Sequence, residues 1–428
     1  MAVLGFALLA AAVLALLALV HRYVWRRLVG DTTTAGSLPR RAGTVAAYVL
    51  PLLSVGALVS GRTGTPFWLQ QVLAWPGYLW LAALLYLTLA LLAGELVRPL
   101  LSRLLARRAG DEPHAAAETV PAEPVTVAQG STVTTAVPPA SAPLAVTQAP
   151  APAAPSRRLF VARAVGGAAA VAGLGTTGYG AYGVLRGPRV KRVAVPLARL
   201  PRSAHGFRIA VVSDIHLGPV LGRAHTQRIV DAVNRTQPDL IAVVGDLVDG
   251  SVEDLGPAAE PLAGLRSRHG AFFVTGNHEY YSGAAEWVDH VRELGLHPLE
   301  NSRVEIDGFD LAGVNDIAGE SEGQGPDFGR ALGDRDRTRA AVLMAHQPVV
   351  IDEAVEHGVD LQLSGHTHGG QLWPGNYIAE LSNPTVAGLE RYGDTQLYVT
   401  RGAGAWGPPV RVGAPSDITV VELASRRA

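Results

Sequence analysis

Five runs of apolar, β-prone residues in the second half of the chain each end in a short polar motif, and this alternation strongly restricts the fold. The runs are Ile209-Ala-Val-Val212, Leu240-Ile-Ala-Val-Val244, Ala271-Phe-Phe-Val-Thr275, Ala341-Val-Leu-Met-Ala345 and Leu361-Gln-Leu-Ser364. Continuous apolar runs of this length are typical of strands that are buried on both faces of a sheet. The sequence therefore predicts a layered α/β domain in this half of the chain.

The motifs that follow the strands are rich in Asp, Asn and His. They are Asp214-Ile-His216, Gly245-Asp246-Leu-Val-Asp249, Gly276-Asn277-His278-Glu279, His346 and Gly365-His366-Thr-His368. The first three begin about 30 residues apart, which is the length of one βαβ unit. Residues 223–236 can form the helix between the first two strands. Since ligands of open α/β sheets bind at the carboxyl ends of the strands, the motifs are predicted to meet at one sheet edge.

The residue types in the motifs predict a metal site. Oxygen donors from Asp and Asn, mixed with imidazole nitrogens, suit divalent Mn, Fe, Zn or Mg and disfavour soft metals. The chain has no cysteine, which excludes thiolate ligands and disulfides. A single motif is easily explained as turn chemistry, because Asp beside Gly is common in turns. All five in order, each after a strand, favour one catalytic centre.

Together the motifs resemble the calcineurin-like metallophosphoesterase superfamily, whose pattern is D-x-H, G-D-x-x-D, G-N-H-[DE], a single H and G-H-x-H. The resemblance covers about residues 195–425. It implies an α/β fold in which two mixed sheets form an α/β/β/α sandwich, and two divalent metal ions whose identity the ligands leave open. The implied ligands are Asp214, His216 and His368 for one metal, Asn277, His346 and His366 for the other, and Asp246 as the bridge.

The same resemblance implies hydrolysis at phosphorus. Two metals about 3.5–4 Å apart would hold a bridging hydroxide as the nucleophile and neutralise charge in the transition state. His278 is the candidate proton donor to the leaving group, oriented by Asp249 or Glu279. Arg401 and Arg411 are candidate phosphate-binding residues because a guanidinium fork matches phosphate geometry. A surface ion pair is an equally good interpretation of Arg411.

Two details narrow the substrate class. Gly250 follows Asp249 where protein Ser/Thr phosphatases usually have Arg, which argues against a phosphoprotein substrate. The segments 365–371 and 401–411 resemble bacterial membrane-associated, phosphodiesterase-like enzymes. Trp406 is predicted either to wall the substrate pocket or to pack in the core. The net charge of −1 gives no basic field that would favour nucleic acid.

The first half of the chain has the composition of a membrane region. Residues 2–20 are apolar without a charge, and at 1.5 Å per residue they reach about 28 Å, enough to span a bilayer. Two further candidate spans are 42–59 and 72–94. Arginines concentrate between the first and second spans and after the third, so the positive-inside tendency places residue 108 in the cytoplasm. Residues 109–156 follow as an Ala/Pro/Thr-rich tract, which predicts a disordered linker.

A fourth membrane segment is predicted directly after the linker. Arg157-Arg158 precedes an uncharged, glycine-rich stretch from 164 to 185, which resembles an internal twin-arginine export signal. The alternative is a chance Arg pair at the base of an ordinary span. Either interpretation makes the chain cross once more and predicts an extracytoplasmic catalytic domain. The basic residues at 186–192 oppose that orientation, because they would lie on the translocated side.

The sequence thus divides into a membrane region (1–108), a linker (109–156), a fourth membrane segment with its arginine motif (157–192) and a catalytic domain (193–428). The expected function is membrane-anchored, dinuclear hydrolysis of a phosphoester, of the phosphodiester or pyrophosphate type. The expected partners are the membrane and a phosphorylated small-molecule or lipid-linked substrate, with no nucleic acid. The alternative is a membrane sensor or scaffold whose phosphoesterase-like domain only binds a phosphorylated ligand.

Overall fold

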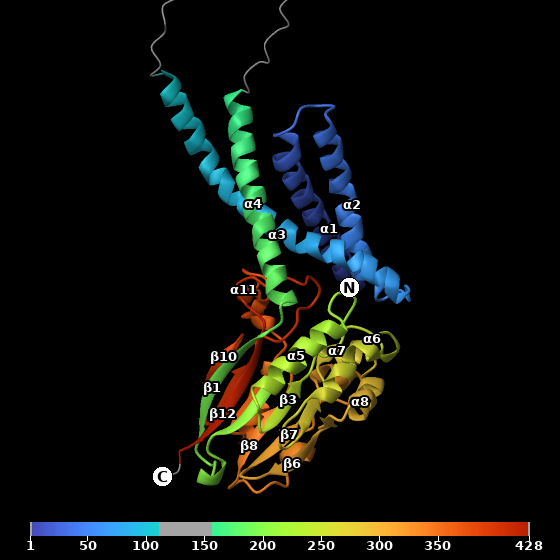
Figure 1. The fold of residues 1–428 in the computed structure, drawn as a ribbon, viewed down its shortest axis with the longest axis vertical. Coiled ribbons are helices and arrows are strands. Elements are labelled where there is room, and N and C mark those ends of the chain that lie inside the picture. Colours follow the sequence, from blue (N-terminus) through green and yellow to red (C-terminus); the bar gives the residue numbers. More distant parts are fainter. Residues whose placement is uncertain (1, 111–155, 427–428) are drawn as a thin grey trace, which may run out of the picture.

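The computed structural model describes residues 2–110 and 156–426, and Figure 1 shows long helices at one end of the molecule and the sheets at the other. The predicted linker lies outside the described residues except at its ends. The long helices are α1 (Ala2–Trp25), α2 (Leu38–Ser60), α3 (Phe67–Gly110) and α4 (Arg157–Leu185). Within the described residues, three stretches are long and apolar enough to cross a membrane: Leu38–Ser60, Phe67–Arg107 and Arg157–Leu185.

Glycines let the long helices approach one another closely. A Cβ at Gly173 of α4 would lie 2.8 Å from the backbone nitrogen of Leu87 in α3. A Cβ at Gly77 of α3 would lie 2.5 Å from the carbonyl oxygen of Leu53 in α2. Helices inside a bilayer gain no hydrophobic stabilisation from contacting one another, because lipid tails are equally apolar. Small residues at the crossings instead let the backbones pack closely. Gly173 therefore has a packing role against α3, and Gly180 has one against the loop at Val410, where a Cβ would lie 2.7 Å from a methyl carbon.

The other half of the molecule contains two six-stranded mixed sheets. The first has the order β1-β12-β2-β3-β4-β5 and the second the order β10-β11-β9-β8-β7-β6. The strands of the first sheet are β1 (Arg189–Leu197), β2 (Phe207–Val212), β3 (Leu240–Val244), β4 (Ala271–Val274), β5 (His297–Pro298) and β12 (Asp417–Ser425). Those of the second are β6 (Ser302–Ile306), β7 (Phe309–Gly313), β8 (Ala340–Met344), β9 (Leu361–Ser364), β10 (Gly388–Tyr392) and β11 (Thr395–Val399).

The sheets pack face to face, and helices cover their outer faces. Phe207 and Ile209 of the first sheet lie in the same buried cluster as Phe309 and Val342 of the second. Burying each such large side chain stabilises the fold by roughly 1.5–3 kcal/mol. The helices α5 (Arg223–Arg235), α6 (Val252–Ala259) and α8 (Ala284–Glu293) contribute to the buried cluster on the outer face of the first sheet. The helices α9 (Phe328–Leu332) and α10 (Ile351–Glu356) cover the second sheet. The predicted α/β/β/α sandwich is confirmed.

The first strand begins before the predicted start of the catalytic domain. β1 runs from Arg189 and pairs in parallel with β12, so the boundary predicted at residue 193 falls inside this strand. Lys191 is held by an ion pair of 2.5 Å to the buried carboxylate of Asp417. Three of the basic residues after the fourth helix, Arg189, Lys191 and Arg192, thus belong to the sheet. The sequence pattern does not reveal this structural role.

The loops beyond the strand ends touch the long helices. The hydroxyl of Tyr86 in α3 donates a 3.1 Å hydrogen bond to the carbonyl oxygen of Trp373. The backbone N–H of Arg411 donates to the carbonyl oxygen of Gly180 in α4 at 3.3 Å. The edge of the sandwich that carries the polar motifs therefore faces the apolar helices, with only a single layer of loops between them.

Candidate metal centre

Five strand ends bring the predicted metal ligands to one place. Asp214 and His216 follow β2, Asp246 follows β3, and His346 follows β8. The remaining ligands stand at the start of α7 (Asn277–Ser282) and directly after β9, as Asn277, His366 and His368. The five segments are separated by up to about 150 residues in sequence but share one sheet edge, as open α/β topology predicts.

The ligating atoms form overlapping groups. Asp214, His216 and His368 can place one ligand atom each within 4.8 Å of one another, as can Asp246, His346 and His366. A third group of this kind joins His216, Asp246 and His278. The first trio is one of the two ligand sets implied by the family resemblance. The second trio contains His346 and His366 of the other set together with the predicted bridge, Asp246, which also approaches the first trio. Its Oδ2 lies 3.1 Å from Nε2 of His346 and 3.7 Å from Nε2 of His216.

The nitrogen and oxygen atoms that could bind metal lie close to one another, as the ligand atoms of a shared metal centre do. Nε2 of His216 lies 3.0 Å from Nε2 of His368, and Nδ1 of His366 lies 3.0 Å from Oδ1 of Asn277. Nε2 of His346 is buried and makes no aligned hydrogen bond to any described residue. A buried nitrogen without a hydrogen-bond partner is costly, and a divalent cation between it and Asp246 would satisfy it. The residues present therefore fit a pair of divalent metals.

The backbone at the centre is strained. Asp214, His216, Asp246, His366 and His368 all have φ between 49° and 71°. This left-handed region is rare for residues other than glycine and costs of order 1–3 kcal/mol at each position. Such strain persists only where the surrounding structure enforces it. The strand ends are thus bent to turn carboxylates and imidazoles inward, which the regular strand pattern of the sequence cannot show.

Glycines leave room for the carboxylate of Asp214. A Cβ at Gly365 would lie 2.4 Å from its Oδ2, and a Cβ at Gly402 would lie 2.5 Å from its Cβ. No real Cβ atom tolerates such distances. The backbone N–H of His366 also donates to both carboxylate oxygens, at 3.0 and 3.2 Å. Asp214 is therefore fixed in one orientation by the segments on either side.

Charges in the buried centre are balanced between carboxylates and imidazoles. Burial would lower the pKa of His216, but Asp249 and Asp246 outweigh it and raise the pKa to about 9. Burial would raise the pKa of Asp249, but His216 and His278 outweigh it and lower the pKa to about 2. The pKa of His366 falls to about 4, because burial disfavours its charged form and His346 repels it. The centre is thus built to hold positive charge beside Asp246.

His278 stands at the rim of the centre. Its Nδ1 lies 2.6 Å from Oδ1 of Asp249, and its ring packs edge-on against Tyr281 and Trp406 with centroids 5.4 and 5.7 Å away. Of the two predicted orienting residues, Asp249 contacts His278. Trp406 and Tyr281 are both exposed, so the structure favours a pocket wall for them over a core position.

Glu279 has a different role from the one considered in the sequence. It is buried, and its carboxylate accepts hydrogen bonds from the backbone N–H groups of Asp246, Leu247 and Gly276 at 3.0, 2.7 and 2.6 Å. Burial and the nearby Asp246 raise its pKa to about 7. Glu279 thereby ties together two of the motif loops. The sequence contains a signal for this role, because a Glu three residues after the N-cap position, here Gly276, is the glutamate of a capping box.

The predicted phosphate contact of Arg411 does not fit its position. Arg411 is buried, and its guanidinium lies 2.6 Å from the carbonyl oxygen of Gly404, 3.0 Å from both the carbonyl oxygen and Nδ1 of His368, and 3.1 Å from the carbonyl oxygen of Ala414. Burial lowers its pKa to about 10. Arg411 is therefore a support for His368. It is neither the surface ion pair nor the phosphate ligand considered from the sequence.

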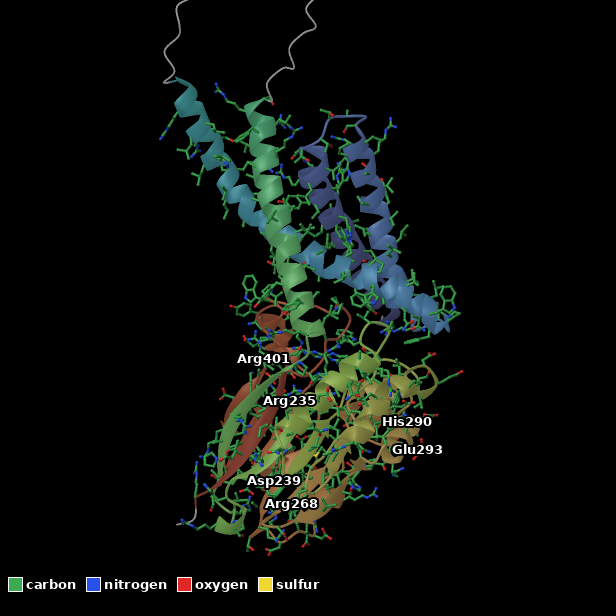
Figure 2. The ribbon with its side chains drawn as sticks, in the orientation of Figure 1. Arg235, Asp239, Arg268, His290, Glu293 and Arg401 are labelled. Carbon is green, nitrogen blue, oxygen red and sulfur yellow. The ribbon has the colours of Figure 1, made fainter. Side chains whose placement is uncertain are left out.

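Arg401 keeps a more open position. Its side chain is one-third exposed, and Nη1 lies 3.9 Å from the carboxylate of Asp417. Figure 2 places Arg401 at the end of the sandwich nearest the long helices, whereas Arg268 and Asp239 lie near the opposite end. Arg401 therefore remains a candidate for substrate contact.

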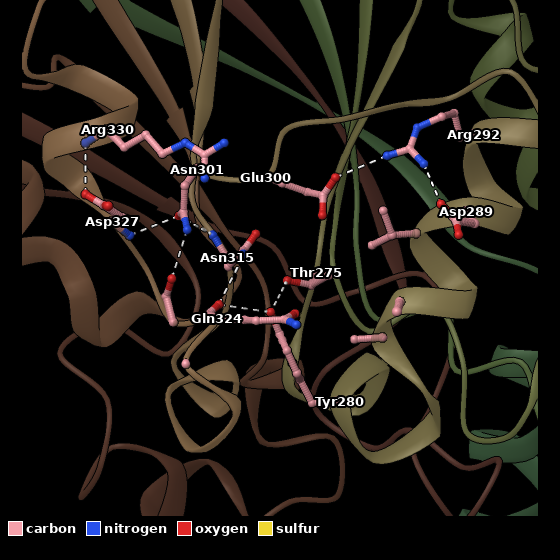
Figure 3. Close-up of a pocket in the computed structure, with 15 residues that line it drawn as sticks. Thr275, Tyr280, Asp289, Arg292, Glu300, Asn301, Asn315, Gln324, Asp327 and Arg330 are labelled. Carbon is pink, nitrogen blue, oxygen red and sulfur yellow. Dashed lines mark hydrogen bonds and ion pairs between the residues drawn. The ribbon is translucent and has the colours of Figure 1, made fainter.

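A cavity of about 460 Å³ lies beside α7 and contains none of the predicted metal ligands. Figure 3 shows that its polar groups bind one another. Asn301 accepts from the backbone N–H groups of Asn315 and Asp327 at 3.0 and 2.9 Å, and its Nδ2 donates to Gly325 at 2.9 Å. These hydrogen bonds hold the loops around residues 315–327 in place. We therefore attribute the polar groups of this cavity to loop structure and not to a ligand site.

Comparisons with known proteins agree with the geometry of the site. Residues 207–370 match the family described as calcineurin-like phosphoesterase. A Danio rerio protein named "Transmembrane protein with metallophosphoesterase domain" is 39% identical over 259 residues, covering 57% of this chain and 59% of that protein. An uncharacterized metallophosphoesterase of Aquifex aeolicus is 35% identical over 240 residues, covering 55% of this chain and 91% of that protein.

Among solved structures, a dimetal phosphatase from Danio rerio is similar to the sandwich. It is 13% identical, has a TM-score of 0.37, and the match covers 51% of this chain and 93% of that chain. The present chain also spans less than two thirds of the transmembrane Danio rerio relative.

Proposed function

Because the chain belongs to the calcineurin-like phosphoesterase family, we propose that it is a membrane-anchored, metal-dependent hydrolase of phosphoester bonds. The observation that carries the proposal is the pair of ligand trios, one around Asp214 and one around His346, that meet at Asp246. A catalytically inactive relative would be expected to lose at least one ligand. Every family ligand is present here and lies at the shared sheet edge.

The metals would be held by two ligand sets with a common carboxylate. One set is Asp214, His216 and His368, the other is Asn277, His346 and His366, and Asp246 belongs to both. When bound, two divalent cations supply an activated water and neutralise charge on the phosphoryl group. The identity of the cations is left open, because a mixed nitrogen and oxygen ligand set suits Mn, Fe, Zn and Mg alike.

His278 would donate a proton to the leaving oxygen. Asp249 accepts from Nδ1 of the ring at 2.6 Å, and no described residue forms a hydrogen bond with Nε2. A carboxylate on one side of an imidazole fixes the orientation of the ring. Trp406 and Tyr281 shield the ring on its exposed side. Arg401 is the remaining candidate for contact with the phosphate, since its side chain is one-third exposed.

The substrate class that best fits the surroundings is a phosphoester carried by a membrane lipid, of the diester or pyrophosphate type. The loops at the mouth of the centre expose large apolar side chains toward the end of the sandwich that touches α3 and α4. These side chains are Trp373, Tyr377, Ile378, Leu381 and Trp406. Aromatic and aliphatic groups of this kind are favoured at a membrane surface. A soluble phosphodiester is the second candidate within the same reaction class.

The proposed location of the catalytic domain is extracytoplasmic. The three candidate spans and the printed name of the Danio rerio relative support association with a membrane. The arginine-rich helix ends lie at the end of the bundle opposite the sheets (Figure 1), and the positive-inside tendency assigns those ends to the cytoplasm. Export by a twin-arginine signal at Arg157-Arg158 is one route that would place the domain outside.

The test uses the full chain in lipid nanodiscs, stripped of metal and reloaded with Mn²⁺. Turnover of an aryl phosphodiester, the matching monoester and a phospholipid with a scissile phosphodiester is measured, with Asp246→Asn as the control. Metal-dependent turnover that the control lacks supports the proposal, and the ranking of the three compounds selects the substrate class. Stoichiometric metal binding without turnover of any of them would instead support the binding-module alternative.

A further inference from the structure

A second cavity is lined by residues near the helix ends that lie opposite the catalytic domain in Figure 1. It has a volume of about 710 Å³ and is formed by residues 27–31, directly after α1, together with residues near the last turns of α3 and the first turns of α4. Its charged lining residues are Arg27, Asp31, Arg98, Arg157 and Arg158. Apolar side chains from α3 and α4, including Leu105, Leu159 and Val161, complete the wall. The metal centre has no part in this cavity.

The carboxylates near the cavity already form ion pairs with one arginine. Arg27 forms ion pairs with Asp31 at 2.9 Å and with Glu95 at 2.8 Å. Arg98 approaches the same Asp31 oxygen only at 3.6 Å. Arg157 and Arg158 form no ion pair with any described residue. The lining therefore carries more positive charge than the nearby carboxylates neutralise.

Arg98 shows that an acceptor is missing. Its side chain is only 19% exposed, and its Nε and Nη2 atoms are buried without a hydrogen-bond partner among the described residues. Leaving donors of a charged group buried and unpaired costs more than leaving neutral ones unpaired. The exposed part of the Arg98 side chain lines the cavity and adds its positive charge to that of Arg157 and Arg158. The cavity is thus shaped and charged for an anion.

We propose that this cavity binds the phosphate of an anionic phospholipid headgroup. The arginines lie at the ends of membrane-spanning helices, where headgroup phosphates are concentrated, and basic pockets between such helices are suited to anionic lipids. The apolar part of the wall, at Leu105, Leu159 and Val161, would accommodate the glycerol and first methylene groups of the lipid. A free phosphate would leave that apolar wall uncovered. The inference does not depend on the phosphoesterase activity.

The experiment measures lipid retention by the full chain. Protein in detergent is incubated with phosphatidylglycerol, phosphatidylcholine or inorganic phosphate, and bound lipid is counted by native mass spectrometry while thermal unfolding is followed in parallel. Arg98→Gln removes the buried guanidinium. Arg103→Gln is the matched control, because Arg103 is an exposed arginine on the same helix that does not line the cavity. Arg157→Gln is a second test at the cavity mouth that disturbs no buried group.

The wild type and Arg103→Gln are expected to retain phosphatidylglycerol over phosphatidylcholine. Arg98→Gln and Arg157→Gln are expected to weaken retention by about tenfold, the loss typical of one charge-assisted hydrogen bond. Equal retention by all four proteins would overturn the proposal, as would equal binding of the two lipids. Full displacement of phosphatidylglycerol by millimolar phosphate would overturn the lipid assignment and identify a free-phosphate site. If Arg98→Gln fails to fold, Arg157→Gln alone decides between these outcomes.

Discussion

The Nδ1 atom of His278 lies 2.6 Å from Oδ1 of Asp249, and the same carboxylate oxygen lies 3.0 Å from Nδ1 of His216. One carboxylate thus connects a predicted metal ligand to the predicted proton donor. The two imidazoles therefore share one carboxylate oxygen. Asp249 is therefore expected to affect both proton transfer and ligand orientation, whereas His278 is expected to affect proton transfer alone.

Replacing His278 with alanine separates catalysis from metal binding. His278→Ala removes the proton donor, so kcat is expected to fall by about 10²- to 10⁴-fold, while the metal content per chain stays unchanged. Turnover of the aryl diester and elemental analysis of the same sample give both quantities. The exposed His297 provides the control, and His297→Ala should retain wild-type turnover. Loss of metal in His278→Ala would show that His278 is itself a ligand.

Asp246 is expected to be the residue on which both metals depend. Asp246→Asn keeps the shape of the side chain but removes the carboxylate charge that lies beside His216 of one ligand set and His346 of the other. Metal affinity should fall by at least about 100-fold, more than the loss typical of residues that only support a ligand. Isothermal titration with Mn²⁺ checks this, with the exposed Asp289→Asn as the control. Retention of two tightly bound metals by Asp246→Asn would contradict the shared-ligand assignment.

Glu279 is expected to contribute to stability through the loops that it connects. Glu279→Gln replaces one of two acceptor oxygens with an amide group that faces backbone donors, so the free energy of unfolding should fall by about 1–3 kcal/mol. Thermal unfolding of the full chain in detergent measures the change. Glu293→Gln on the outer face of α8, where Figure 2 shows Glu293, should leave the midpoint unchanged. Equal unfolding midpoints for Glu279→Gln and Glu293→Gln would contradict the structural role of Glu279.

The sequence predicts strands well where one continuous apolar run is buried on both faces. The runs before the five motifs form β2, β3, β4, β8 and β9. The sequence fails at β1, because Arg189 and Lys191 alternate with valines and are stabilised by a strand more than 200 residues away. The positive φ of the ligands, at Asp214 for example, also depends on tertiary contacts, since Gly365 and Gly402 must leave space around it.

The candidate site was predictable in its members but not in its supports. The metal-ligand motifs are local in sequence, so their residue types can be read directly. Arg411 could not be assigned in that way, because its partners Gly404, His368 and Ala414 are chosen by the packing of separate loops. A buried arginine and a phosphate-binding arginine have the same appearance in a sequence. Burial alone separates them.

Stability of the folded chain is expected to depend on pH through His225 in α5. His225 is buried, and both ring nitrogens lack a hydrogen-bond partner among the described residues. Burial, with repulsion from Arg228 and Arg411, lowers its pKa to about 4 in the folded state. The unfolded chain, with an ordinary pKa of about 6.5, therefore binds more protons between these two values. The free energy of unfolding accordingly falls as the pH drops from about 6.5 toward 4.

The size of that effect follows from the two pKa values. At 1.36 kcal/mol per pKa unit, His225 alone should make the protein about 2 kcal/mol less stable at pH 5 than at pH 8. Other groups titrate in the same range, so the test is a difference between two proteins. His225→Leu has no proton to gain and leaves no unpaired nitrogen, and should show a shallower decline in its unfolding midpoint between pH 8 and pH 5. Parallel declines for the two proteins would mean that His225 is hydrated or hydrogen-bonded in the native state, because only then would its protonation carry no cost.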